Sequence, residues 1–356
     1  MSFTTGTATD YKNLLEKLRD YITGVDVSPN VDRGWVLLKD TSITSPQPSV
    51  YEMIFQGHGD SSPAKEIFFG IQTYEDAPTG YYNWDVKGFT GYNATSPETA
   101  FASQPGISPD CYVPLQNTTI TYWFYVTGRR VCMIAKTGTA YQFMYCGFID
   151  PFATDSEYPY PLMIMGSSYL VTQKFSDNDI EYASSSNPAG TSDTTPGASH
   201  SSGYLRFTDG QWYGVKNYRE NVNAEFTLTT DVINVWPLGP HDKDDFSTIN
   251  QGTFASHMFG SRYRADSSGG TPTANLGLTE DGGNGVPPLF PLTLVMTSPS
   301  TQILGEIHNV YWVSGAQGLT AEDTITDTTV SPQQVYTTFQ NIHRTDEWMF
   351  IAIKDE

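Results

Sequence analysis

Residues 117–149 read NTTITYWFYVTGRRVCMIAKTGTAYQFMYCGFI, and this stretch decides the fold. It contains three strand-length runs of β-branched and aromatic residues, separated by turns at Thr127-Gly128 and Thr137-Gly138-Thr139. Such residues favour strands, and short glycine-containing turns join neighbouring antiparallel strands. The stretch therefore predicts a three-stranded meander, which is a framework element and carries no catalytic motif.

The overall composition is that of a β protein with an aromatic core. Of the 356 residues, 38% are hydrophobic, 13% are aromatic and only 16% are charged. Aromatic side chains bury a large area each, so 22 Tyr, 19 Phe and 7 Trp compensate for a modest number of aliphatic residues. We predict a mainly β fold: a β-sandwich or barrel-like antiparallel core with one N-terminal α-helix and long ordered loops.

The N-terminal helix is expected over residues 9–23. Apolar residues recur there at three- and four-residue spacing, namely Tyr11, Leu14, Leu15, Leu18, Tyr21 and Ile22. Thr9 or Asp10 can cap its start, and Gly24 can end it. Residues 1–24 are thus predicted to form an N-terminal helical arm. The helix packs either on the chain's own sheet or on a neighbouring subunit, and in the second case Tyr11, Leu14 and Leu18 are the candidate contacts.

The remaining chain is expected to divide into two β parts. Residues 25–182 form a β domain that includes an aromatic loop at 74–116, where Gly, Pro, Asn and Thr separate the aromatic residues. Residues 183–203 are too polar to pack by themselves and are predicted to be an exposed loop. A hairpin signal at Asp209-Gly210 follows at once, so we expect 204–356 to be a second β part packed with the first.

The charge of the chain limits its partners. The formal net charge is -20 and the pI is near 4.5. Such a surface repels phosphate backbones and anionic membranes, so we expect no direct nucleic-acid partner. No apolar run approaches the ~20 residues that span a bilayer, and no secretory signal is recognised at the start. Self-assembly must then use apolar or locally complementary patches.

The sequence offers no chemistry that rises above chance. The three cysteines, Cys111, Cys132 and Cys146, show no zinc spacing and are no disulfide framework. Cys132 and Cys146 lie within expected strands and are predicted to be buried free thiols. The acidic segment 241–245 lacks the pattern of a calcium loop, and the six histidines form no metal-binding motif. Paired carboxylates of a glycosidase cannot be recognised among 39 acidic residues. We predict no enzyme activity, and no catalytic residue, cofactor or metal ligand is assigned.

Aromatic residues in the segment 74–116 are the remaining candidates for a binding site. Tyr81, Tyr82, Trp84 and Tyr92 could stack on sugar rings if they stand exposed on a loop. The alternative is that they fill the space beneath that loop, and this alternative is favoured.

One set of features follows in order along the chain: Tyr11 to Leu18, Gly34-Trp35, Glu66 to Ile71, Tyr82-Asn83-Trp84, Gly88 to Tyr92, Gln104-Pro105-Gly106, Ile120 to Phe124, Arg129-Arg130, Tyr158 to Leu162, Leu205-Arg206, Asp209 to Trp212 and Leu304-Gly305-Glu306. This order of features resembles virion structural proteins of tailed bacteriophages, mostly encoded among tail and baseplate genes. The resemblance covers most of the chain.

The resemblance implies a tail or baseplate component without catalytic residues, assembled in the host cytoplasm and located in the virion. It also implies a homo-oligomer, expected to be a symmetric ring, with contacts to other phage tail or baseplate proteins. The helix, the segment 74–116 and the polar segments 183–203 and 239–288 are the expected contact elements. A carbohydrate-binding or host-receptor tail protein is the alternative, with a glycan as partner, and a polysaccharide-cleaving enzyme is third.

Overall fold

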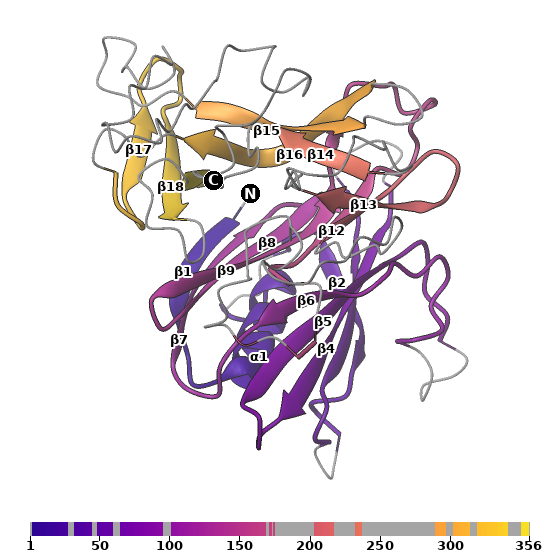
Figure 1. Cartoon of the computed structure of the whole chain (residues 1–356), viewed down its shortest axis with the longest axis vertical. Helices are drawn as coiled ribbons and strands as arrows, with labels where there is room; N and C mark the ends of the chain where they lie inside the picture. The colour runs from indigo at the N-terminus through magenta and orange to yellow at the C-terminus, as the bar shows by residue number, and fades with distance from the viewer. Residues whose placement is uncertain are drawn as a thin grey trace, which may run out of the picture.

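The computed structural model describes residues 2–27, 32–44, 48–59, 65–94, 101–168, 171–172, 174, 203–216, 232–236, 289–296, 302–313, 319–340 and 350–355. These residues form a mainly β protein with one α-helix near the N-terminus, in a sandwich-like arrangement of two sheets (Figure 1). The fold class predicted from the sequence is therefore confirmed.

The large sheet runs through most of the chain. Its strands follow the spatial order β1 (Ser2–Ala8), β7 (Ile120–Val126), β8 (Arg130–Thr137), β9 (Ala140–Phe148), β11 (Leu162–Met165), β12 (Gly203–Arg206), β13 (Trp212–Lys216), β14 (Val232–Trp236), β15 (Leu289–Met296), β16 (Gln302–Val313), β19 (Phe350–Asp355), β18 (Gln334–Gln340) and β17 (Thr324–Asp327). The short β10 (Asp150–Pro151) pairs with β16, and all pairs are antiparallel except β13 with β14.

The small sheet is a simple antiparallel succession. It contains β2 (Trp35–Asp40), β3 (Glu52–Gly57), β4 (Ile67–Asp76), β5 (Tyr81–Phe89) and β6 (Cys111–Pro114), in this order. One hydrophobic cluster fills the space between this sheet and the face of the large sheet that carries Phe124, Met133 and Cys146.

The predicted meander is confirmed as β7, β8 and β9, and it lies at the centre of the molecule. Both faces of these strands are covered, and all nine residues of β9 are buried. Phe143 and Ile134 pack in a second cluster with Leu294 and Phe339 from the C-terminal strands, on the face opposite the small sheet. Burial on both faces explains why this stretch is almost continuously apolar instead of alternating.

The helix α1 (Tyr11–Ile22) closes the space between the two sheets (Figure 1). Asp10 caps its start, since its carboxylate accepts hydrogen bonds of 2.8 Å from the backbone N–H groups of Lys12 and Asn13. Gly24 follows with a φ of 74°, a left-handed conformation that glycine adopts without strain. The helix therefore packs on the chain's own sheets.

Two expectations about the N-terminal part need correction. Residues 1–24 are not a helical arm, because Ser2–Ala8 forms β1 and extends the large sheet beside β7. Residues 74–116 are not one long loop, because β4 continues to Asp76, and β5 and β6 lie within the segment. Among the described residues of the segment, only 77–80, 90–94, 101–110 and 115–116 lie outside strands.

The two predicted β parts share one sheet. Antiparallel β11 and β12 pair between Met163 and Leu205, so the segment between them connects neighbouring strands. The predicted hairpin at Asp209-Gly210 is confirmed by the pairing of β12 with β13. Residues 183–202 and 239–288, both expected to be polar loops, lie outside the described residues.

Candidate interaction surfaces

The aromatic residues proposed for sugar stacking are distributed between the core and the surface. Trp84 is fully buried in β5, and its indole N–H donates a hydrogen bond of 2.9 Å to the carbonyl of Tyr11. Tyr82 packs against the ring of Tyr11, with 5.4 Å between the ring centroids. The placement of Trp84 on an exposed loop is therefore wrong, because β5 turns this residue towards α1.

Tyr81 and Tyr92 lie apart from these two. Tyr92 covers the outer face of the small sheet, and its hydroxyl donates to the carbonyl of Leu38 at 3.3 Å. Tyr81 stands at the end of the β4–β5 hairpin, where the Lys174 ammonium lies 5.8 Å from its ring centroid. The four residues thus form no common stacking platform.

The helix residues proposed as subunit contacts belong to the core. Tyr11, Leu14 and Leu18 are all buried between the sheets. The Tyr11 hydroxyl donates to Glu75 at 2.7 Å, and burial together with this carboxylate raises the pKa of Tyr11. These side chains hold the helix in the fold and are covered before any subunit could reach them.

A polar depression of about 360 Å³ lies at the start of α1. It is lined by Thr9, Asp10, Tyr11, Lys12, Asn13, Glu16, Tyr51, Glu75 and Asn117. The Lys12 ammonium lies 5.5 Å from the ring centroids of both Tyr11 and Tyr51 and 3.2 Å from Glu75. The favourable position for a cation between the two rings and a carboxylate is thus filled by the chain's own lysine.

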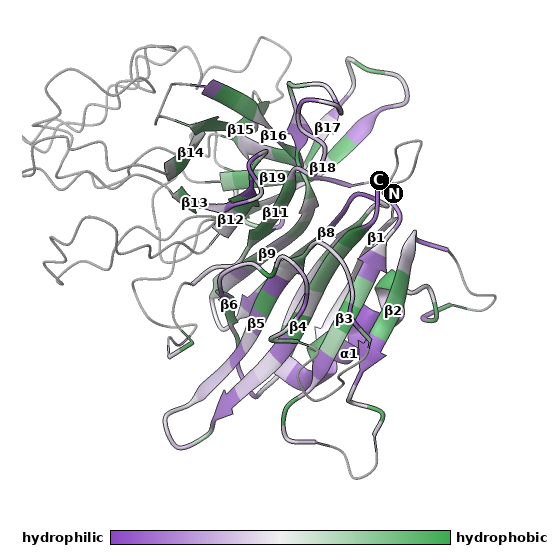
Figure 2. Cartoon of the chain, turned by 90° about the vertical axis from the view of Figure 1, so that its right-hand side faces the viewer, coloured by the Kyte–Doolittle hydropathy of each residue, from purple (hydrophilic) through white to green (hydrophobic). Residues whose placement is uncertain are grey.

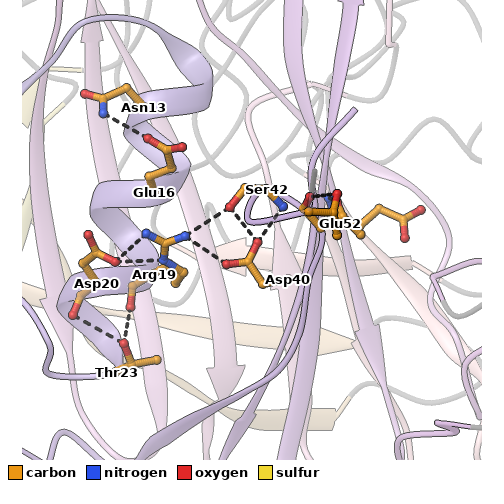
Figure 3. Close-up of polar contacts among 10 residues, drawn as sticks. Asn13, Glu16, Arg19, Asp20, Thr23, Asp40, Ser42 and Glu52 are labelled. Carbon is orange, nitrogen blue, oxygen red and sulfur yellow. Dashed lines mark hydrogen bonds and ion pairs between the residues drawn. The ribbon is translucent and has the colours of Figure 1, made fainter. Parts of the chain in front are cut away.

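Arg19 fixes the helix to the edge of the small sheet (Figure 3). Its guanidinium contacts Asp40 at 2.9 Å and Ser42 at 3.1 Å, at the end of β2, and also Asp20 at 2.7 Å on the helix itself. The Asp40 side chain is only 3% exposed, so this carboxylate depends on Arg19 and Ser42 for its partners. The contact positions β2 and α1 relative to each other.

A second charged cluster joins the β7–β8 turn to β16. Asp150 lies 3.1 Å from the Arg129 guanidinium and 2.7 Å from His308 Nδ1. Burial acts to raise the pKa of Asp150, but the hydrogen bond from His308 and the charges of His308, Arg129 and Arg130 outweigh it and lower the pKa. Each carboxylate oxygen of Asp150 has a partner, Arg129 for one and His308 for the other. The cluster therefore holds β10 and β16 to the β7–β8 turn, and His308 is not placed to activate a nucleophile.

No metal site is evident among the described residues. In that part of the chain, no three side chains of His, Cys, Asp or Glu gather closely enough to hold an ion. All three cysteines are free and buried, which confirms the prediction for Cys132 and Cys146. No described helix is long and apolar enough to cross a membrane.

Exposed apolar side chains concentrate in the first fifty residues. The large apolar side chains that stand exposed in the described part of the chain are Phe3, Val25, Val27, Val36, Ile43, Val50, Phe152, Ile303 and Val330, and the first six of these nine precede residue 51. Val36 is 43% exposed and Ile43 is 74% exposed. They lie on and around β2, which is an edge strand of the small sheet.

The edge strand of the large sheet lies on the same side of the molecule. Figure 2 shows β1 and β2 towards the same side of the sandwich, whereas Figure 1 shows them apart, since they are edge strands of different sheets and α1 contacts both. β1 was not predicted from the sequence. The only sequence signal for it is the high share of Phe and Thr, which favour strands, and the structure shows exposed positions at Phe3, Thr5 and Thr7 alternating with half-buried or buried ones.

No model of a known protein family matches the chain, and no curated protein matches it.

Proposed function

We propose that the chain is a non-enzymatic structural component of a tailed-bacteriophage virion, in the tail or baseplate. It assembles there as a homo-oligomer and contacts neighbouring tail proteins. The resemblance described above supports the phage context, and the distribution of exposed apolar side chains supports assembly.

The exposed apolar side chains around β2 are the observation that carries this proposal. A chain with a net charge of -20 repels its own copies, so contacts between copies must avoid charge and gain from apolar burial. Contiguous exposed apolar surface is rare on monomers and marks interaction sites. The segment 25–50 supplies Val25, Val27, Val36, Ile43 and Val50 next to one sheet edge.

Mass spectrometry of purified virions tests the phage assignment. The chain should be found in the particle with a copy number that matches a symmetric assembly. Its absence from washed, infectious particles would contradict the assignment, whatever the protein does in isolation.

Light scattering on the purified full chain tests whether the exposed apolar side chains around β2 form a contact between copies. We expect Ile43→Ser combined with Val36→Ser to lower the mass of the oligomer. Val330→Ser is the matched control, because this valine is also exposed (38%) but belongs to the C-terminal part. An unchanged mass for the double variant would place the contact elsewhere.

A further inference from the structure

The described part of the chain has four sheet edges, and three of them are protected against pairing. β2 carries Lys39 and Asp40 and has a bulge in its register with β3. β6 ends at Pro114, and two backbone hydrogen bonds of 2.9 Å between Tyr112 and Ser168 cover it. Charges, prolines and bulges are the usual means by which proteins prevent edge-to-edge association.

The edge at the far end of the large sheet is protected by charge. β17 has only four residues and ends in Asp327, with Glu322 and Asp323 just before it. Two copies of this strand would bring like charges together, which disfavours self-pairing.

The β1 edge has none of these protections. Its seven residues read SFTTGTA and contain no charge and no proline, and its register with β7 is uninterrupted. Its backbone pairs with β7 on one side, and no described residue pairs with its other side. Such an edge is a template for another strand.

The sequence of β1 is also complementary to itself. In an antiparallel pair centred on Thr5, Ser2 faces Ala8, Phe3 faces Thr7, and Thr4 faces Gly6. No like charges meet, and a Thr–Thr pair forms at the centre, which is a favourable cross-strand contact. Phe3 already rests on Tyr125, with 4.9 Å between ring centroids, so its position is set before a partner arrives.

We propose that β1 pairs antiparallel with β1 of a second copy of this chain, about a two-fold axis at Thr5, and so joins two large sheets into one. This inference rests on the proposed homo-oligomer and names its partner and contact. Strand addition of this kind uses main-chain hydrogen bonds for affinity, and a two-fold contact uses the same surface on both copies. A ring would need a second, different contact, for which the exposed side chains of Val36 and Ile43 are available.

A charge exchange at the axis tests the pairing in the full chain. Thr5→Lys alone and Thr5→Glu alone each place two like charges at the centre and should weaken the dimer by at least about tenfold in sedimentation velocity. A mixture of the two variants should associate within about threefold of the unchanged protein, because opposite charges then meet. Thr326→Lys on β17 is the control and should change nothing.

A cysteine at position 5 gives a second readout. The three native cysteines are buried, and Thr5 is exposed, so Thr5→Cys provides one accessible thiol beside its own symmetry mate. Mild oxidation should yield a disulfide-linked dimer, whereas Thr326→Cys should not. Near-ultraviolet circular dichroism confirms that each variant is folded.

The outcomes separate the two proposals. A mass in both charged variants that equals that of the unchanged protein, or a Thr5→Cys protein that stays unlinked, overturns β1 pairing and leaves the homo-oligomer intact. Recovery of association by the mixed variants supports β1 pairing even if virions lack the chain, which overturns only the phage assignment. An unchanged protein that stays a monomer at all concentrations overturns both the pairing and the homo-oligomer.

Discussion

Asp85 is a buried acid whose charge the fold does not fully compensate. It lies on β5 with a side chain that is 14% exposed, and its Oδ1 has no hydrogen-bond partner among the described residues. Lys87 is 3.8 Å away from it but only 2.6 Å from Asp110. Burial raises the pKa of Asp85 to about 7, and the charge of Lys87 opposes this only in part.

This pKa makes stability depend on pH in a defined direction. In the unfolded chain the group titrates near 4, so the folded state binds the proton more tightly. The contribution of Asp85 to folding is greatest below about pH 4 and is lost as the pH rises to about 7. Asp85→Asn should raise the free energy of unfolding at pH 8, by at most about 4 kcal/mol, and flatten its decline between pH 4 and 7.

Urea unfolding at pH 5 and pH 8 measures this effect. Asp155→Asn is the control, since its carboxylate is largely exposed and its contact with Lys65 is at the surface. If the free energy of unfolding declines with pH equally in the Asp85 variant and the unchanged protein, then Asp85 is ionised in the folded state at little cost in stability.

Trp84 and Tyr81 show how far the roles of aromatic residues can differ over three positions. Trp84→Ala should lower the free energy of unfolding by about 4 kcal/mol, because it removes a fully buried ring and its hydrogen bond to Tyr11. Tyr81→Ala should change it by less than about 0.5 kcal/mol, as expected for a site at a hairpin end. Chemical unfolding measures both, and equal effects would contradict the structural distinction.

The alternation in β5 could have predicted this difference. Trp84 and Val86 face the core between the sheets, while Asp85 and Lys87 lie half-buried on the opposite face of the small sheet, a period of two that is visible in the sequence. The nearby Gly, Pro and Asn residues favoured a loop instead. What the sequence could not show is that α1 covers this face, because the contact between Trp84 and Tyr11 spans 73 positions.

At the level of elements, one ion pair joins α1 to the end of β2. Arg19→Met should cost about 3 kcal/mol, because it leaves the buried Asp40 carboxylate without its charged partner. Replacing both residues, as Arg19→Met with Asp40→Leu, should recover most of the loss, since no charge is then buried. The free energy of unfolding from urea titration is the measurement.

The matched control breaks an exposed pair on the same helix. Lys12 and Glu75 are 3.2 Å apart but partly in solvent, so Lys12→Met should cost less than about 1 kcal/mol. A double variant at Arg19 and Asp40 that is no more stable than the single one would contradict the burial argument.

The sequence predicts the buried strands better than the exposed ones. The central meander was recognised because both of its faces are covered, which makes it almost continuously apolar. β1 was missed because it has one large apolar residue and a glycine in its middle. The reason for Gly6 is tertiary: a Cβ there would lie 2.7 Å from the hydroxyl of Tyr122.

At the scale of the whole molecule, the spatial order of the strands could not be predicted from the sequence. The sheet joins β9 to β11 and β12 and then returns through β16 and β18, so its C-terminal strands cover the outer face of the meander. The hydrogen bond between Asp150 and His308 joins residues 158 positions apart, and the Tyr141 hydroxyl donates a hydrogen bond of 2.6 Å to Glu322, 181 positions away. No local pattern encodes such pairings.

Because these contacts join the two parts, we expect the chain to unfold in a single transition. Phe339 reaches from β18 to Trp123 and Tyr141 of the meander, with ring centroids 5.2 and 5.9 Å apart. Phe339→Ala should lower the unfolding midpoint, with a cost of about 3–5 kcal/mol for the lost burial and the cavity left behind.

The midpoint of Phe339→Ala should shift equally whether unfolding is followed by far-ultraviolet circular dichroism or by tryptophan fluorescence. The reason is that the cluster between the two sheets, which contains Trp84, unfolds together with the cluster that contains Phe339. Val330→Ala, an exposed change near the same strand, should leave the midpoint in place. Two separate transitions, with Phe339→Ala moving only one, would show that the second β part folds independently of the meander despite sharing its sheet.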